Sequence, residues 1–305
     1  MKVLVTGGCG FIGQHIVEEL VKRNYRVAVI DVTCYEDCHV LHSDVRYYHA
    51  DITENLDDIF EKEKPDYVIH LAAQVDVVKS IEKPKLDATI NITGTINILD
   101  CCYKHSVKKL IYASSAAVYG EPAYLGIDED HPQNPTSFYG ISKHSAELYI
   151  KAFSDLHELN YTILRYANVY GPGSKANGNV ISTFIDLMSN DKQPEIFGDG
   201  NQSRDFIFVK DVANANIAAL HRGDRQTINI STGKPTTLNE LVKKLNSLLN
   251  KNLTANYLPA RDGDISQSYL TNIKAHDSLN WGIEYSLERG LQFTLNQDKE
   301  NLHDK

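Results

Sequence analysis

The chain has 305 residues, enough for one large or two smaller domains, and its 42% apolar and 23% charged residues are typical of a globular protein. Its formal net charge of −9 and the lack of a basic stretch argue against nucleic acids and anionic membranes as partners. No apolar run approaches the ~20 residues of a membrane span, and no secretion signal is recognisable, so we expect a cytoplasmic protein.

The chain begins with a strand, a glycine-rich turn and a helix. An apolar, β-branched run at residues 2–6 precedes Gly7, Gly10 and Gly13, and the apolar residues of 16–21 then repeat at helical period. Glycines at this spacing let the backbone approach a pyrophosphate at the positive end of a helix. The pattern predicts a dinucleotide site after the first strand.

A second strand over residues 26–30 ends in Asp31. A carboxylate at this place can accept hydrogen bonds from both hydroxyls of an adenine ribose and would repel a 2′-phosphate. The position of Asp31 therefore favours NAD over NADP.

The segment after Asp31 contains four residues that can bind zinc, namely Cys34, Cys38, His39 and His42. Their spacing matches no zinc module, so we expect a variable loop without metal, and zinc is the alternative. The five cysteines of the whole chain indicate reduced thiols and not a disulfide framework.

Strands and helices then alternate, which predicts a doubly wound parallel α/β sheet of the Rossmann type with ligands at the carboxyl ends of the strands. Strands are expected at 45–49, 67–71, 109–114 and 161–165, and helices at 55–63, 85–105 and 138–159.

The pattern loosens beyond residue 171. A strand at 206–209 and a helix at 212–220 are expected to return to the main sheet. We therefore expect a cofactor domain of residues 1–171 plus 206–233. A smaller, interleaved α/β substrate domain would contain residues 172–205 plus 234–305.

Tyr139 and Lys143 are four residues apart, so a helix places both side chains on one face. An ammonium group beside a phenol lowers the phenol's pKa, and such a pair can take a proton from a hydroxyl. Ser114 and Ser115 end the neighbouring strand and should lie at the same edge of the sheet. The alternatives are an ordinary half-buried helix face and turn or cap serines.

Seven ordered motifs place this sequence beside a known family: TGGCGFIG (6–13), HLAAQVDV (70–77), NITGTINIL (91–99), SSAAVYG (114–120), YGISK (139–143), LRYANVYGP (164–172) and RDFIFVKDVA (204–213). With them the chain resembles the extended short-chain dehydrogenase/reductases, and within these the nucleotide-sugar 4-epimerases of the UDP-glucose 4-epimerase type. The resemblance covers nearly the whole chain.

The resemblance implies a catalytic set. Tyr139 would be the base and later the acid at carbon 4 of the sugar. Lys143 would lower the pKa of Tyr139 and bind the nicotinamide ribose. Ser115 would orient the proton transfer. The family's tightly bound NAD would pass a hydride to and from carbon 4 through a 4-keto sugar. The resemblance also implies a homodimer that is formed by helices 85–105 and 138–159.

The same resemblance assigns the binding residues. The NAD contacts would be Gly7, Gly10, Phe11, Ile12, Gly13, Asp31, Asp51, Ile52, Leu71, Ala72, Ala73, Asn91, Ser114, Tyr139, Lys143 and Tyr166. The UDP-sugar contacts would be Ser115, Tyr139, Asn168, Val180, Arg204, Arg261, Asp264 and Ser268.

Two positions narrow the expected substrate. Ala116 and Ala117 stand where related dehydratases carry an acidic pair, which disfavours water elimination. Ser268 stands where glucose-only epimerases carry a bulky tyrosine, so we expect room for an N-acetyl group, unless Tyr269 fills that space. A hydride-exporting nucleotide-sugar reductase, a dehydratase and an inactive NAD-sensing protein are the alternative functions.

Overall fold

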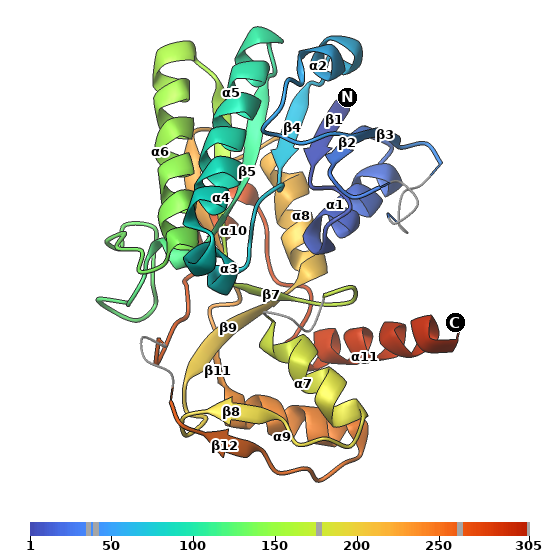
Figure 1. The fold of residues 1–305 in the computed structure, drawn as a ribbon, viewed down its shortest axis with the longest axis vertical. Coiled ribbons are helices and arrows are strands. Elements are labelled where there is room, and N and C mark those ends of the chain that lie inside the picture. Colours follow the sequence, from blue (N-terminus) through green and yellow to red (C-terminus); the bar gives the residue numbers. More distant parts are fainter. Residues whose placement is uncertain (35–37, 39–42, 175–178, 261–264, 304–305) are drawn as a thin grey trace.

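The computed structural model describes residues 1–34, 38, 43–174, 179–260 and 265–303 (Figure 1). A seven-stranded parallel sheet forms its upper part and has the strand order β10-β6-β5-β4-β1-β2-β3. This confirms the predicted doubly wound sheet. The strands are β1 (Lys2–Thr6), β2 (Arg26–Asp31), β3 (Arg46–His49), β4 (Tyr67–His70), β5 (Lys109–Ser115), β6 (Asn160–Tyr166) and β10 (Gln226–Ile230).

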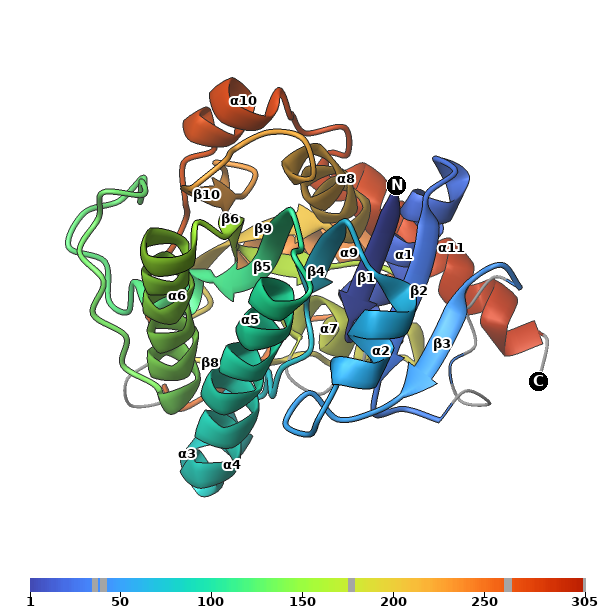
Figure 2. The same ribbon diagram turned by 90° about the horizontal axis from the view of Figure 1, so that it is seen from above.

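Helices cover both faces of this sheet, as Figures 1 and 2 show. Successive strand residues point to opposite faces, so Val3 packs in a core with α1 and α8, whereas Leu4 packs in another core with α5 and α6. Both cores contain fully buried apolar side chains. The helices of this part are α1 (Phe11–Lys22), α2 (Asp57–Glu63), α3 (Val77–Glu82), α4 (Pro84–Ala88), α5 (Thr95–Lys104), α6 (Phe138–His157), α8 (Val209–Ala219), α10 (Ile273–Leu279) and the short 3-10 turn η3 (Ala116–Val118).

The helix predicted over residues 85–105 is interrupted. A π-helical segment, η2 (Thr89–Gly94), separates α4 from α5 and contains the buried Asn91. Single π-turns inside helices are frequent at functional sites, because they redirect side chains that an unbroken helix would place elsewhere.

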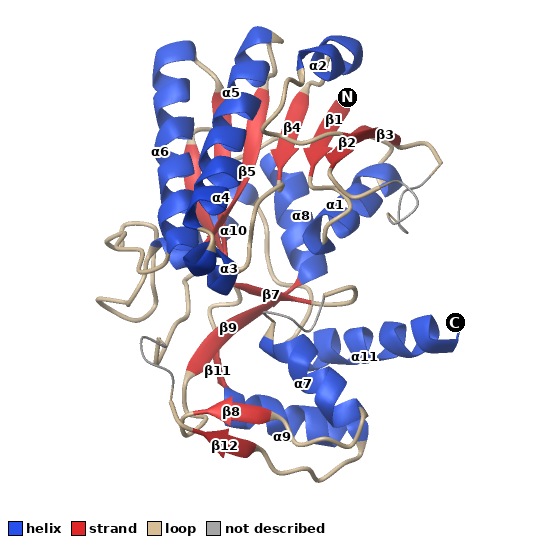
Figure 3. Ribbon diagram, in the orientation of Figure 1, coloured by secondary structure: helices blue, strands red, loops and turns tan. Residues whose placement is uncertain are grey.

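Two small sheets and three helices form the lower part of the molecule, which Figure 3 shows by secondary structure. Phe184, Phe206 and Leu241 are buried in its own apolar core. Its elements are β7 (Asn168–Tyr170), β8 (Glu195–Phe197), β9 (Ser203–Phe208), β11 (Pro235–Thr237), β12 (Asn256–Leu258), α7 (Val180–Ser189), α9 (Leu238–Leu249) and α11 (Leu287–His303).

The prediction assigned one strand to the wrong sheet. Residues 206–209 were expected to return to the main sheet, but β9 pairs with β7 and β11. The place beside β6 is filled by β10, whose Ile230 is in register with Tyr166. Only the following helix, α8, returns to the main sheet, where it shares a core with α1.

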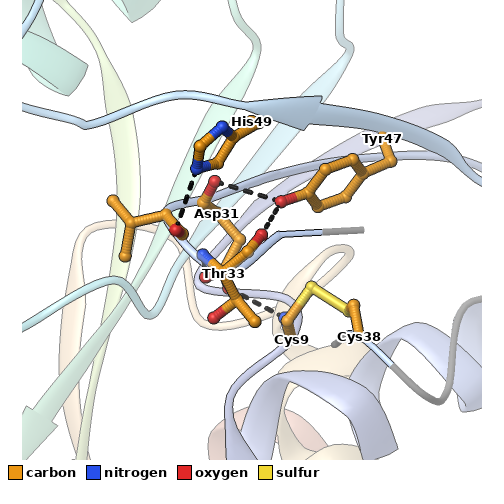
Figure 4. The surroundings of a disulfide bond; sticks show 7 residues. Cys9, Asp31, Thr33, Cys38, Tyr47 and His49 are labelled. Carbon is orange, nitrogen blue, oxygen red and sulfur yellow. Dashed lines mark hydrogen bonds between the residues drawn. A yellow bond between two sulfur atoms is a disulfide. The ribbon is translucent and has the colours of Figure 1, made fainter. Parts of the chain in front are cut away.

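The prediction that the cysteines are reduced thiols is wrong for Cys9 and Cys38. A disulfide joins Cys9, in the glycine turn, to Cys38, with 5.4 Å between their Cα atoms (Figure 4). Cys34, Cys101 and Cys102 are free thiols. A sequence separation of 29 residues gives no sign of this approach, which arises because β1 and β2 are neighbouring parallel strands.

The disulfide also bears on the zinc alternative. The sulfur of Cys38 is bonded to Cys9 and is therefore not a free thiolate ligand. His39 and His42 lie outside the described residues. No helix within the described ranges is long and apolar enough to cross a membrane.

Candidate active site

A cavity of about 700 Å³ lies at the carboxyl ends of the central strands. It collects residues from the glycine turn, from the ends of β2, β4, β5 and β6, and from α6 and α7. The predicted site residues that line it are Gly7, Gly10, Phe11, Ile12, Gly13, Asp31, Asp51, Ile52, Leu71, Ala72, Ala73, Ser114, Ser115, Tyr139, Lys143, Tyr166, Asn168 and Val180.

The glycine turn has no space for side chains. Gly7 has a φ of +72°, and a Cβ atom added there would lie 2.7 Å from the backbone nitrogen of Ala72. A Cβ atom at Gly13 would lie 2.1 Å from the carbonyl oxygen of Gly7. The backbone itself therefore forms the cavity wall at the start of α1, where the helix end favours negative charge, and this fits a dinucleotide pyrophosphate.

Asp31 is buried at the end of β2 and is held by backbone donors (Figure 4). One carboxylate oxygen accepts the N–H of Cys9 at 2.9 Å, and the other accepts the N–H of Thr33 at 2.9 Å. The disulfide-bonded Cys9 thus fixes the glycine turn against Asp31. This leaves a carboxylate in the wall of the cavity, where a ribose hydroxyl could donate to it.

Local contacts bring Tyr139 and Ser115 together. The hydroxyl of Ser137 caps α6 by accepting the N–H of Gly140 at 3.1 Å. A Cβ atom at Gly140 would lie 2.6 Å from the carbonyl oxygen of Ala117, so this glycine permits the close approach of α6 to η3, the turn that Ser115 begins. Tyr139 is half-buried and forms a hydrogen bond with Ser115.

Lys143 is buried one helical turn further along α6. Its ammonium group donates to the carbonyl oxygen of Ala113 at 2.8 Å and lies 4.9 Å from the ring centre of Tyr112. Burial lowers the pKa of Lys143 to about 8, whereas the carboxylates of Asp87 and Glu147 act in the opposite direction.

The tyrosine departs from the prediction. Burial raises the pKa of Tyr139 to about 12, although the hydrogen bond with Ser115 acts in the opposite direction. Burial disfavours the charged form of both Tyr139 and Lys143.

A buried ion pair contacts Ser114 at the edge of the site. Arg165 of β6 donates from Nε and Nη2 to the carboxylate of Glu147 of α6 at 2.9 and 2.6 Å. The hydroxyl of Ser114 donates to the same carboxylate at 2.5 Å, and Arg165 Nη1 donates to the hydroxyl of Tyr119 at 2.9 Å. The sequence offered one signal for this network, an arginine in the otherwise apolar run of residues 161–166.

The remaining predicted site residues are not among the described residues that line the cavity. Asn91 is buried beside the cavity in a polar cluster with Gln74. Arg204 lines an adjoining hollow of about 370 Å³, which shares Asn168 and Val180 with the cavity. Ser268 does not line either space; its N–H donates to the carbonyl oxygen of Ser203 at 3.1 Å. Arg261 and Asp264 lie outside the described residues.

Sequence reasoning missed part of the lining. Most of the missed residues are neighbours of predicted ones at strand ends, so extending each predicted contact by one or two positions would have found them. They are Ile30, Val32, Thr33, Ala50, Val75, Ile90, Ala113, Ala167, Val169, Asn179 and Phe206.

Comparison with known proteins agrees with this geometry. The model of the NAD dependent epimerase/dehydratase family matches residues 3–231. A provisionally named UDP-glucose 4-epimerase of Methanocaldococcus jannaschii is 44% identical over 303 residues, which covers 98% of this chain and 99% of that protein.

Two solved structures are similar over nearly the whole length. A UDP-glucose 4-epimerase of Thermotoga maritima with UDP-glucose has a TM-score of 0.95 and 38% identity, and covers 99% of this chain and 100% of that chain. A UDP-N-acetylglucosamine 4-epimerase of Methanobrevibacter ruminantium in complex with UDP-N-acetylmuramic acid has a TM-score of 0.93 and 35% identity, and covers 98% of each chain. The chain therefore belongs to the NAD dependent epimerase/dehydratase family and is an NAD-dependent enzyme.

Proposed function

We propose that the protein is a 4-epimerase that interconverts the gluco and galacto forms of UDP-hexoses, including the N-acetylated ones. One observation carries the proposal: Ser115, Tyr139 and Lys143 line the same cavity as the glycine turn and Asp31. The cavity thus joins a proton-transfer group to a dinucleotide site. The names of the similar proteins, UDP-glucose and UDP-N-acetylglucosamine 4-epimerases, support the same reaction.

The chain's own residues would handle the proton. Tyr139 would take the proton of the hydroxyl at carbon 4 and return it, and the hydroxyl of Ser115 would orient that transfer. Lys143, fixed on the carbonyl of Ala113, would hold a ribose hydroxyl and favour the phenolate. When bound, NAD would accept the hydride from carbon 4 and give it back to the other face of a 4-keto sugar.

The two parts of the molecule would hold the two ligands. We propose that residues 1–171 plus 206–233, except for β7 and β9, which belong to the lower part, bind NAD through the glycine turn, Asp31, Asp51, Asn91 and the other predicted contacts. Residues 172–205 plus 234–305 would bind the UDP-sugar. Arg204, with Arg261, would hold its pyrophosphate by charge-assisted hydrogen bonds, and Asn168, Val180 and Asp264 would complete the nucleotide site.

The reaction can be tested directly. Purified protein is incubated with UDP-N-acetylglucosamine and no added NAD, and the sugar signals are followed by proton NMR. The galacto isomer should appear, because retained NAD is regenerated in each cycle. If neither this substrate nor UDP-glucose is converted, with or without added NAD, the proposed function is wrong.

Substitution of Ser268 by tyrosine should lower activity on the N-acetylated substrate and largely preserve activity on UDP-glucose. Ser268 itself does not line the cavity, and we propose that the longer tyrosine side chain would reach the 2-acetamido group and lower kcat/KM at least about tenfold. Tyr269 does not line the cavity, and its hydroxyl lies 3.6 Å from where an added Cβ atom of Gly126 would be. Ser268→Ala is the matched control and should keep both activities; unchanged N-acetyl turnover in Ser268→Tyr would contradict the steric argument.

We also propose a homodimer that is formed by α5 and α6. These helices leave large apolar side chains exposed, with Tyr103 at 51%, Leu148 at 53% and Leu156 at 77% exposure. Exposed apolar residues grouped in this way are typical of a protein interface. Light scattering should give twice the chain mass of 34.2 kDa, and a mass of one chain would contradict the proposal.

A further inference from the structure

The carboxyl group of Asp87 is buried behind the cavity and is not explained by the proposed reaction. Asp87 lies on α4 with 1% of its surface exposed. Its Oδ1 accepts hydrogen bonds from Gln74 Nε2 at 3.0 Å and from Asn91 Nδ2 at 3.1 Å. A buried carboxylate normally has a cationic partner, but no ion pair among the described residues includes Asp87.

Hydrogen bonds connect Asp87 to the backbone of Tyr139. Asn91 Nδ2, besides reaching Asp87, donates to the hydroxyl of Ser142 at 3.0 Å. That hydroxyl donates to the carbonyl oxygen of Tyr139 at 3.0 Å. Asn91 Oδ1 also accepts the N–H of Gln74 at 2.8 Å, which fixes the loop after β4. The π-turn η2 places Asn91 at the centre of these contacts.

The charged and titratable groups around Tyr139 and Lys143 come from several elements. Glu147 of α6 is paired with Arg165, and burial lowers the pKa of His70 of β4 to about 3, so that this ring is neutral. Tyr112 of β5 is an uncharged phenol whose pKa burial raises. Of the two carboxylates near Tyr139 and Lys143, Glu147 is paired with a guanidinium group and, within the described residues, Asp87 is not. The groups are Asp87 (α4), Glu147 (α6), His70 (β4), Tyr112 and Ser115 (β5) and Arg165 (β6).

We propose that Asp87 is a positioning residue of the reaction: through Asn91 and Ser142 its carboxylate holds the start of α6, and its negative charge keeps the proton on the Tyr139–Lys143 pair. This inference rests on the proposed function. The charge attracts the ammonium of Lys143 and repels a phenolate at Tyr139, so it raises the pKa of both groups. Asp87 thereby moves the loss of a proton from either group to higher pH.

The test is Asp87→Asn, which keeps the shape and the acceptor oxygen but removes the charge. Both limbs of the pH profile of kcat/KM should move to lower pH by about one unit, because the charge of Asp87 raises the pKa of both Tyr139 and Lys143. Asp57→Asn, at a half-buried residue of α2, removes the same charge from the molecule and should leave both limbs in place.

A second measurement does not depend on turnover. The tyrosinate absorbance of Tyr139 is obtained from a pH titration of the holoenzyme minus that of Tyr139→Phe, in wild-type and Asp87→Asn backgrounds. The midpoint should fall in the Asp87→Asn background even if the protein is not an epimerase, so this titration separates failure of the inference from failure of the proposed function. Unmoved limbs or an unmoved midpoint in a folded variant would overturn the inference.

Two further variants separate charge from packing. Gln74→Met removes one hydrogen bond to Asp87 but keeps the carboxylate, so kcat should fall while the limbs stay at their wild-type pH. A shift equal to that of Asp87→Asn would mean that packing, not charge, is responsible, and would overturn the inference. If Asp87→Asn does not fold, Asp87→Ser replaces it with the same expected direction.

Discussion

Replacing Tyr139 with phenylalanine should lower kcat for epimerisation by about 10³-fold and leave the fold and the bound NAD unchanged. General acid–base catalysis typically contributes 10²- to 10⁴-fold, and the substitution removes the hydroxyl of Tyr139 that forms a hydrogen bond with Ser115. The phenyl ring keeps the packing of α6. NMR turnover, the thermal unfolding temperature and the NAD content of the purified protein together measure the effect.

The matched control for this variant is Tyr149→Phe. Tyr149 lies on the same helix, is 44% exposed next to the proposed dimer contact Leu148 and does not line the cavity; phenylalanine keeps its ring, so the change should alter kcat by less than twofold. Turnover by Tyr139→Phe within tenfold of wild type would show that another group takes the proton and would remove the proposed mechanism.

Replacing Glu147 with glutamine should lower the free energy of unfolding by about 3–5 kcal/mol. The change leaves the guanidinium of Arg165, which is 1% exposed, without its bidentate partner, and an uncompensated buried charge is costly. The hydroxyl of Ser114 loses a charged acceptor as well. Urea unfolding of the holoenzyme, followed by circular dichroism, gives the difference.

Two variants test the reason for this loss. Glu61→Gln removes an exposed carboxylate that pairs with Lys64, and it should change stability by less than about 0.5 kcal/mol. Adding Arg165→Met to Glu147→Gln should recover part of the loss, because it removes the unpaired charge. A loss below about 1 kcal/mol in Glu147→Gln would show that the pair contributes little to the fold.

The sheet was predictable because several of its strands, such as β1 and β5, are short apolar runs that are followed by a helical pattern. The same signal failed at residues 206–209, because an apolar run indicates a buried strand without indicating the sheet to which it belongs. There the outcome depended on β10, whose pairing with β6 left β9 to the smaller sheet.

The cavity was predictable because parallel strands end at one edge, which brings the glycine turn, Ser115 and Tyr139 together from distant parts of the chain. Features that depend on how deeply a side chain is buried, or on an unusual turn, were not predictable. The pKa of Tyr139 is raised by burial, which residue spacing does not reveal. The position of Asn91 depends on a π-turn for which we know no sequence signal.

The bond between Cys9 and Cys38 gives this polypeptide two chemical forms. It closes a covalent ring that contains α1 and β2, and its Cys9 end donates a hydrogen bond to Asp31 in the cavity wall. Dithiothreitol in the buffer reduces the disulfide to two thiols, which adds two hydrogen atoms and opens the ring. The cavity wall is then held by non-covalent contacts alone. Samples purified with and without a reductant are therefore different molecules at this wall, and cofactor contents are comparable only between samples with equal thiol counts.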